Sequence, residues 1–555
     1  MTIERDTFAE VPVRDERSTA TRSLRAALHY FSATLQSQQG LLDARRRELA
    51  AIGDKLEEVT DTLAHRQAEI EGLRQTLAQR EAEIDRLAQA LARPSRLRLV
   101  LRHPVRAVRY VLRRIVQRLR PVAPPQAAVL PQPTPALGWM STPVPARVQP
   151  SDYRDRMRAL LDEGPFRGLR TLTLVVPPAM RQAGVAIESG LAETGLACTV
   201  AFAMPAQFTD ALYLVVNPCA FARLPPAGRR IVWLVEPAEQ TATLSEAVLA
   251  PLAESLAIFD ASLTHIAALQ ARGIALYQTF YVPLDLATAP DALLADDSPM
   301  GLAHLLPRAL HGCGAIDDEA FERATRGTRL DADHLVLCLP ESLARFESAR
   351  AHLRPGAALF PGLRQLDGWK GTALSYRFMA RRALAAGRTR LIVSEDDAEL
   401  GEGFEARLAK TLEHLDLHAG RWDLFSGLLT DLSERAEVKA VEASGSDLFL
   451  RLDSVIGMVF GIYGPPALAA LATYRVAGND TMKDTIDRYL EALRLRCVTI
   501  FPPLVWHGED FASTLWMPEG WRFSSNESMN PMIHRSQLRL VAKIGECLER
   551  DQTPR

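Results

Sequence analysis

The sequence has no closely spaced cysteine pair, no long apolar run and no large excess of charge of either sign. Its six cysteines are scattered, which argues against a zinc site or a disulfide framework and is typical of a reducing compartment. The absence of an apolar run of about 18 residues argues against a transmembrane helix, and the N-terminus lacks the apolar core of a signal peptide. With 65 Lys and Arg against 67 Asp and Glu, the net charge of -2 gives no global signal for nucleic-acid or membrane binding. These absences predict a cytoplasmic protein.

A heptad repeat runs through residues 41–92. Apolar residues recur there in alternating steps of three and four from Leu42 to Leu91, and Glu, Arg, Gln and Ala occupy most positions between them. About seven heptads in one register favour a partner helix over a single helix that folds back on its own domain. We therefore predict a coiled coil that forms a homo-oligomer, most simply a dimer, preceded by a poorly structured segment at 1–40.

Residues 93–120 carry ten arginines and no acidic residue, interleaved with leucine, valine and isoleucine. A helix with this pattern has a basic and an apolar face, and it can lie on the surface of an anionic membrane. A plain solvated helix and nucleic-acid binding are the alternatives, the second disfavoured because few aromatics and no recognition motif accompany the arginines. The proline-rich residues 121–150 are typical of a semi-stiff linker.

Short apolar runs alternate with helix-length segments across residues 151–287, namely TLTLVVP, ACTVAFA, ALYLVV, RIVWLVEP and LYQTFYVP. With crossover helices between them, such as Gln182–Thr194 and Val248–Phe259, these runs predict a Rossmann-like domain with a parallel sheet. No GxGxxG follows the first run, so a dinucleotide site is not expected. The order of segments loosely resembles the N-terminal lobe of bacterial two-lobed glycosyltransferases. Residues 288–330 are predicted to form a connector.

Residues 331–555 resume the alternation of strands and helices, which predicts a second α/β domain, and they carry ordered motifs. A Ser-x-x-Arg turn follows the first strand, a Gly-x-x-x-Ser segment opens a helix, and the strand LIVSEDD ends in three acids. A strand with tyrosine, an Ala-Leu helix, a helix-borne aspartate and a Pro-Pro strand follow. The residues are, in order, Ser342 and Arg345, Gly371 and Ser375, Leu391 to Asp397, Tyr463, Ala467 and Leu468, Asp487, and Pro502 and Pro503.

These motifs in this order resemble glycosyltransferase family 25, which includes lipopolysaccharide-biosynthesis glycosyltransferases and collagen galactosyltransferases. The resemblance covers residues 332–516. It implies a GT-A-like nucleotide-sugar domain, an inverting mechanism, a UDP-sugar donor with galactose as the first guess, and Mn²⁺ or Mg²⁺. Two positions depart from the family pattern: Tyr376 stands where the family has histidine, and Ser513, Thr514 and Leu515 replace its closing Ser-Asp-Ile.

The acidic triplet Glu395, Asp396 and Asp397 is the centre of this prediction. A nucleotide-sugar diphosphate is an anionic leaving group, and a divalent cation held by carboxylates at the end of a strand can neutralise it. Asp397 is the first choice of metal ligand and Asp396 the second, while Glu395 is expected to contact ribose or backbone. The alternative is that these acids merely precede the helix at 404–415 and favour its positive end.

Other roles fall to residues outside the triplet. An inverting enzyme needs a general base for the acceptor hydroxyl, and Asp487 is the first candidate, followed by Asp431 and Asp510. Asp487 could equally form an ion pair with Arg488 or Lys483 on an exposed helix. His507 is a third candidate metal ligand, although a structural histidine is the more common case. Contacts with the nucleotide-sugar are predicted for Arg345, Lys370, Ser375, Glu395 and Asp396.

The sequence therefore predicts a glycosyltransferase at the cytoplasmic membrane surface that acts on a lipid-linked or other glycan acceptor, such as bacterial lipopolysaccharide. The rival interpretation is a non-catalytic coiled-coil scaffold whose glycosyltransferase-like domains bind glycan or partner enzymes. The missing histidine and the altered closing motif keep that rival open.

Overall fold

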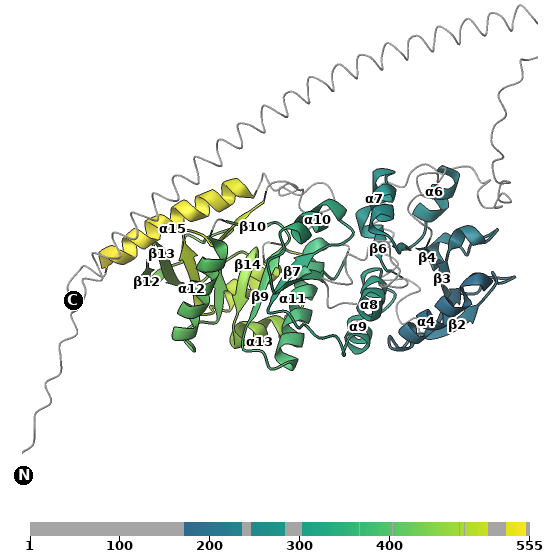
Figure 1. Cartoon of the computed structure of the whole chain (residues 1–555), viewed down its shortest axis with the longest axis horizontal. Helices are drawn as coiled ribbons and strands as arrows, with labels where there is room; N and C mark the ends of the chain where they lie inside the picture. The colour runs from purple at the N-terminus through teal and green to yellow at the C-terminus, as the bar shows by residue number, and fades with distance from the viewer. Residues whose placement is uncertain are drawn as a thin grey trace, which may run out of the picture. The chain divides into compact units, whose positions relative to one another are not determined.

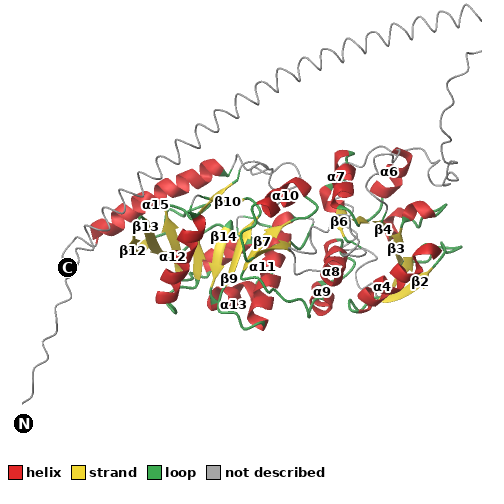
Figure 2. Ribbon diagram, in the orientation of Figure 1, coloured by secondary structure: helices red, strands yellow, loops and turns green. Residues whose placement is uncertain are grey.

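The computed structural model describes residues 171–235, 246–283, 302–365, 367–401, 403–476, 478–481, 483–508 and 529–550. The predicted N-terminal segment, coiled coil, basic helix and linker lie outside these residues, as does Asp510. The described chain is a mixed α/β structure with two large sheets in one compact unit (Figures 1 and 2). None of its helices has both the length and the apolar character needed to cross a bilayer.

The first sheet has six strands in the order β2-β1-β3-β4-β5-β6, and every neighbouring pair is parallel. The predicted parallel sheet is therefore confirmed. Strands β3 and β4 are buried along their whole length, as expected where both faces are covered. The elements are β1 Thr171–Val175, η3 Pro178–Met180, α4 Arg181–Ala192, β2 Ala197–Ala201, β3 Leu212–Val216, η4 Pro218–Ala220, η5 Ala227–Arg229, β4 Arg230–Leu234, α6 Glu246–Ala253, β5 Ala257–Asp260, α7 Leu263–Ala271, η6 Leu276–Gln278 and β6 Thr279–Tyr281.

One predicted helix of this sheet is partly wrong. The helix expected at Val248–Phe259 ends at Ala253, and Ala257–Asp260 forms β5 between β4 and β6. All four residues of β5 are buried. An apolar run this short shows neither the helical nor the strand period, so the pattern could not separate it from the preceding helix.

The second sheet has eight strands in the order β12-β13-β15-β11-β14-β9-β7-β8 and mixes directions. β8, β7 and β9 are parallel, whereas β14 is antiparallel to both β9 and β11. β10 and β16 form a separate antiparallel pair. The strands are β7 His334–Cys338, β8 Ala357–Pro361, β9 Leu391–Glu395, β10 Ala398–Leu400, β11 Leu424–Ser426, β12 Val438–Ser444, β13 Asp447–Leu452, β14 Phe460–Tyr463, β15 Cys497–Phe501 and β16 Val505–His507.

Helices pack against this sheet (Figure 2). Phe404 and Leu408 of α12 and Ile533 of α15 join a core with the strand residues Ile392 and Phe460. Helices α8 and α9 lie in the segment predicted as a connector. The helices are α8 Leu302–Gly312, α9 Asp318–Ala324, α10 Leu343–Ala351, α11 Gly368–Ala385, α12 Phe404–Leu417, α13 Pro465–Thr473, α14 Ile486–Ala492 and α15 Asn530–Arg550.

The connections around β7 create a crevice. The chain passes from β7 to β8 on one side of β7 and then returns through α11 to β9 on the other side. At such a switch point the loops that leave the carboxyl ends of the two strands diverge, and open α/β sheets bind ligands there. Since the acidic triplet begins at the last residue of β9, the fold puts it at this crevice.

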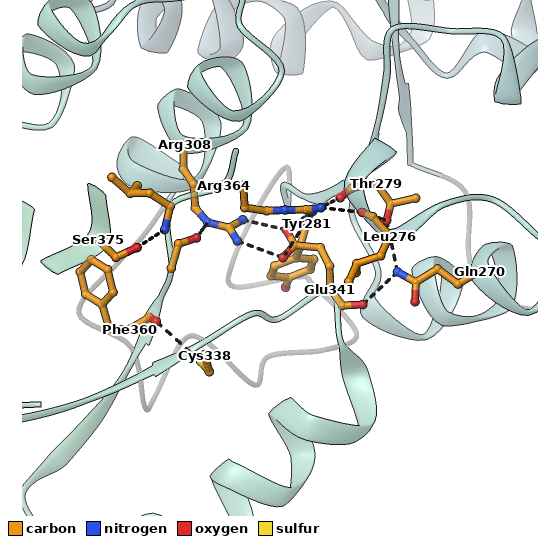
Figure 3. A network of polar contacts seen from close by, with 12 residues as sticks. Gln270, Leu276, Thr279, Tyr281, Arg308, Cys338, Glu341, Phe360, Arg364 and Ser375 are labelled. Atoms are coloured by element: carbon orange, nitrogen blue, oxygen red, sulfur yellow. Dashed lines mark hydrogen bonds and ion pairs between the residues drawn. The ribbon is translucent and has the colours of Figure 1, made fainter. Parts of the chain in front are cut away.

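A buried ion pair lies behind the crevice (Figure 3). The guanidinium of Arg308 on α8 contacts the carboxylate of Glu341 after β7 at 2.7 Å and 2.9 Å, and both side chains are fully buried. The N–H of Tyr281 in β6 donates to the same carboxylate at 2.8 Å. Arg308 Nε also donates to the carbonyl of Gly362 at 2.7 Å. One carboxylate thus joins β6, α8 and the loop that follows β7.

We expect Glu341→Gln to lower the free energy of unfolding by about 3–5 kcal/mol, because it leaves the buried guanidinium of Arg308 without its counter-charge. Denaturant unfolding of the full chain measures the change. Asp416→Asn is the control, because Asp416 pairs with Arg390 at 2.6 Å while 64% of its side chain is exposed. That variant should change stability by at most about 1 kcal/mol. Equal losses of unfolding free energy in the two variants would contradict a larger contribution from the buried pair.

The same pair predicts a dependence on pH. Burial alone would raise the pKa of Glu341, but the neighbouring Arg308 lowers it from 4.5 to about 2. A lowered carboxyl pKa contributes stability that is present above the unfolded-state pKa and is lost as the pH falls through the folded-state value. The stability advantage of the parent over Glu341→Gln should therefore shrink between pH 4.5 and about 2. Unfolding of both proteins across that interval tests this, and a constant difference would contradict it.

Candidate functional site

A pocket occupies the switch point, between the loops that leave β7, β8 and β9. Part of its wall is the short helix η6, which directly precedes β6 of the six-stranded sheet. The lining comprises residues 276–277, 337–339, 362–365 and 395–397, together with Arg345, Gly368, Thr372 and Ser375.

The acidic triplet spans the end of β9 and the turn to β10. The N–H of Glu395, the last residue of β9, donates to Val459 O at 2.9 Å. Asp396 and Asp397 form the turn, after which the β10–β16 pairing sets Ala398 opposite His507. This pairing brings His507 beside Asp397, although the two are far apart in the sequence.

Arg345 is a cation that faces the triplet. It lies in the first turn of α10, whose N-cap is Ser342, and side chains there point back toward the N-terminal end of the helix. Its Nε donates to Asp396 Oδ2 at 3.1 Å, and its Nη2 donates to Asp397 Oδ2 at 3.0 Å and to Asp396 Oδ1. Burial alone would lower the pKa of Arg345, but the two aspartates raise it above its ordinary value. The Ser-x-x-Arg motif thus delivers a permanent positive charge to the acidic turn.

The negative charge of the three carboxylates is only partly balanced. Burial raises the pKa of Glu395 well above its usual value, and the charges of Asp397 and Asp396 add to the rise. Burial also raises the pKa of Asp396, against the opposing effect of Arg345. A further cation in the pocket would favour the ionised forms of these carboxyls.

Asp397 keeps one uncommitted oxygen. Among the described residues, nothing donates a hydrogen bond to its buried Oδ1, and the buried Nδ1 of His507 also lacks a partner. The other imidazole nitrogen, Nε2, lies 3.5 Å from Asp397 Oδ2. Asp396, in contrast, is engaged at both oxygens by Arg345. Asp397 is therefore the more available of the two as a cation ligand.

Tyr376 follows Ser375 in α11, at the position where the resemblance implies a histidine. Its hydroxyl donates to Met458 O at 3.0 Å, and its ring packs edge to face on Tyr463 with centroids 5.8 Å apart. Burial raises the pKa of Tyr376 well above its ordinary value, and the charge of Glu395 contributes. The phenol therefore stays neutral and is a poor proton acceptor.

Asp487 lies within electrostatic range of the triplet. It sits in the first turn of α14, half-buried, and its charge contributes to the raised pKa of Glu395. Lys483 Nζ lies 3.4 Å from Asp480, and the guanidinium of Arg488 contacts other carboxylates. The side chains of Lys483 and Arg488, which were the alternative partners of Asp487, therefore pair with other carboxylates. The backbone N–H of Arg488 does donate to Asp487 Oδ1 at 2.9 Å.

Asp431, the second base candidate, is engaged in an ion pair. Its Oδ2 accepts from Arg488 Nη2 at 3.1 Å, and the same guanidinium contacts Glu491 at 3.1 Å. The carboxylate of Asp431 is therefore held in a direct ion pair with an arginine, whereas no described side chain forms an ion pair with Asp487.

Lys370 and Ser375, both on α11, have other partners. Lys370 Nζ lies 3.0 Å from Asp367 and lines a separate pocket, so the structure does not bring it to the triplet. The hydroxyl of Ser375 donates to Gly371 O at 2.8 Å and accepts from Leu363 N at 2.7 Å. Ser375 lines the pocket, and its hydroxyl ties the segment after β8 to helix α11.

Arg364 is a pocket residue that the sequence reasoning missed. Its Nη2 donates to Leu276 O at 2.6 Å, and its guanidinium lies 4.6 Å from the centre of the Phe280 ring. These contacts hold η6 against the pocket. A single arginine shortly after a buried strand was the only sequence signal, and it has no period or motif to distinguish it.

Gly371 permits a close approach between α11 and the pocket wall. A Cβ at this position would lie 2.6 Å from Leu363 O, which is backbone and cannot swing away. We expect Gly371→Ala to destabilise the protein by about 1–3 kcal/mol through overpacking. Gly545 in α15 is the matched control, because nothing lies within 4 Å of its added Cβ. Gly545→Ala should stabilise the protein by up to about 1 kcal/mol. Thermal unfolding measures both variants, and a Tm that shifts in the same direction in both would contradict the prediction.

Comparison with known proteins gives no family for this chain: no protein-family model matches it, and a search of curated proteins finds no match.

Proposed function

We propose that the pocket at the ends of β7 and β9 binds a UDP-sugar and that the protein is a metal-dependent glycosyltransferase. The observation that carries the proposal is the partly buried acidic triplet, which faces Arg345 at a topological switch point. The antiparallel β14 beside β9, and the β10–β16 pair next to the triplet, agree with the GT-A-like arrangement that the resemblance implies.

The residues of the pocket fit a divalent cation. Carboxylate oxygens are the donors that Mg²⁺ and Mn²⁺ prefer, and Asp397 has an uncommitted one. We assign Asp397 as the first ligand, Asp396 as the second and His507 as the third. The bound cation would supply the positive charge that a departing diphosphate needs. Arg345 holds the acidic turn in place and adds a fixed positive charge beside it.

Proton transfer falls to Asp487 in this proposal. An inverting transfer needs one base within reach of the acceptor hydroxyl, and a half-buried carboxylate not spent on an arginine suits that role. Asp431 is the second choice, and Asp510 lies outside the described residues. Glu395, with its raised pKa, is assigned to a hydrogen bond with the nucleotide-sugar rather than to the base.

The remaining assignments rest on resemblance and on segments outside the described residues. We propose galactose as the first donor sugar to test and a bacterial surface glycan, such as lipopolysaccharide, as the acceptor. The basic segment 93–120 would hold the enzyme at the cytoplasmic face of an anionic membrane, near lipid-linked acceptors. The coiled coil at 41–92 would make it a homo-oligomer.

One observation favours the non-catalytic scaffold as a second candidate. Arg345 already balances part of the charge of Asp396 and Asp397, which is how a site that has lost its cation would be stabilised. The neutral Tyr376 cannot replace a histidine in proton transfer. Under this alternative the pocket would bind neither UDP nor Mn²⁺ tightly.

Calorimetric titration of the full chain with UDP, with and without Mn²⁺, separates the two. The glycosyltransferase proposal expects metal-dependent binding that falls on the order of 100-fold in Asp397→Asn, because a cation ligand is lost. Asp487→Asn should retain the binding, since the proposed base does not hold the cation. Asp333→Asn is the surface control, because 95% of that side chain is exposed, and it should behave as the parent. Absence of UDP binding by the parent in Mn²⁺ would favour the scaffold.

A further inference from the structure

Three side chains that could together hold a metal ion lie at the β12 edge of the eight-stranded sheet. His414 and His418 are one turn apart at the end of α12, and side chains with this spacing share a helix face. Glu442 comes from β12, the edge strand beside them. One ligand atom from each of the three residues lies within 4.8 Å of the others. In the sheet, β14, β11, β15 and β13 separate this cluster from the acidic triplet after β9.

The ring of His418 is oriented for ligation. Its Nδ1 lies 2.8 Å from the carbonyl of His414, and only a protonated Nδ1 can donate to that oxygen. The neutral ring then has its lone pair on Nε2, which lies 3.2 Å from Glu442 Oε2. A backbone carbonyl that fixes the tautomer in this way is the usual outer partner of a metal-bound histidine.

His414 is also fixed in position. Its ring stacks on Phe449 with centroids 3.8 Å apart and planes within 6°, and its Nε2 lies 4.0 Å from the same Glu442 oxygen. The two rings and the carboxylate oxygen therefore converge on one point.

The plain alternative is that His418 only caps its helix. His352 shows what capping alone looks like, because it ends α10 with the same contact, 2.8 Å from its Nδ1 to the carbonyl of Ser348. His352 belongs to no cluster of potential ligands in the part of the chain that the structure describes. What distinguishes His418 is the second imidazole and the carboxylate that face it.

Within the described parts of the chain, one cation competes with the histidines for Glu442. Arg451 Nε lies 3.9 Å from its Oε1, at the edge of ion-pair distance, with half of the arginine side chain exposed. That contact involves Oε1, whereas both imidazoles face Oε2. The oxygen needed for a metal ion therefore remains directed at the histidines.

We propose that His414, His418 and Glu442 bind one Zn²⁺ ion, with water as the fourth ligand, and that the ion clamps the end of α12 to the edge strand β12. Two imidazoles and a carboxylate are a donor set that zinc accepts in tetrahedral geometry. Donor atoms around tetrahedral zinc lie about 3.3 Å apart, so small rotations of these partly exposed side chains suffice. Exposed fractions of 14%, 30% and 38% for the three side chains leave an entry path from solvent.

The test uses the full chain, purified without a histidine tag and stripped with a chelator. Competition with a chromophoric zinc indicator gives the number of tight Zn²⁺ equivalents and their Kd. We expect His418→Ala and Glu442→Gln each to weaken one equivalent on the order of 100-fold, because each removes a ligand. Glu442→Gln keeps the shape of the side chain, so this variant should fold even if replacement of a histidine disturbs packing. His352→Ala removes the matched capping histidine and should bind Zn²⁺ as the parent does.

Thermal unfolding distinguishes a clamp from adventitious surface binding. Zn²⁺ should raise the Tm of the parent and of His352→Ala, because an ion bound only by the folded state stabilises it. The rise should be absent in Glu442→Gln, whose Tm in chelator should match the parent's. Zinc binding that is unchanged in Glu442→Gln and His418→Ala, or a Tm of the parent that zinc does not raise, would overturn the proposal.

Discussion

The buried pair of Arg308 and Glu341 is the interaction on which the pocket depends most. Glu341 immediately precedes Ser342 and the first turn of α10. Its ion pair with Arg308 therefore also fixes the start of α10, from which Arg345 extends to the acidic turn. Arg308 holds Gly362 as well, which lines the pocket. A fully buried charge has a high desolvation cost, and only well-formed hydrogen bonds offset it. The geometry of the pocket is therefore specified by a contact that lies behind it.

Charge inside the pocket follows a different balance. The acidic turn would be costly to bury alone, and Arg345 offsets part of that cost through Asp396 and Asp397. Glu395 is not offset by a cation in this way. Burial and the neighbouring aspartates instead raise its pKa, which favours the neutral carboxyl. A site with one fixed cation and unused carboxylate capacity can accept a second, exchangeable cation without unfolding. The same arrangement of charges can persist without that second cation, so the proposed scaffold and the proposed enzyme predict the same fold and differ only in what the pocket binds.

Sequence patterns predicted what is local and periodic. Continuous apolar runs predicted the strands of both sheets, and the segment LIVSEDD predicted the strand that ends at the crevice. The short strand β5 was hidden in an apolar run without a period. Contacts such as Arg308 with Glu341, or Arg364 with Leu276, join residues whose sequence neighbours carry no motif, so only the folded chain reveals them. The coiled coil and the basic segment stay predictions, since both lie outside the described residues.

Helix α12 links the two candidate cation sites. It begins shortly after β10 and ends at Leu417, with His418 as its C-cap beside β12. In its first turn, Arg407 donates to the carbonyls of Pro502 and Pro503 at 2.6 Å and 2.8 Å, and these residues lead into β16 and His507. A clamp at the end of α12 would therefore limit the motion of the segment that carries His507 to Asp397. If the proposed ion binds at the sheet edge, its effect on the pocket would pass through α12 and Arg407, and it would contribute no ligand to the pocket.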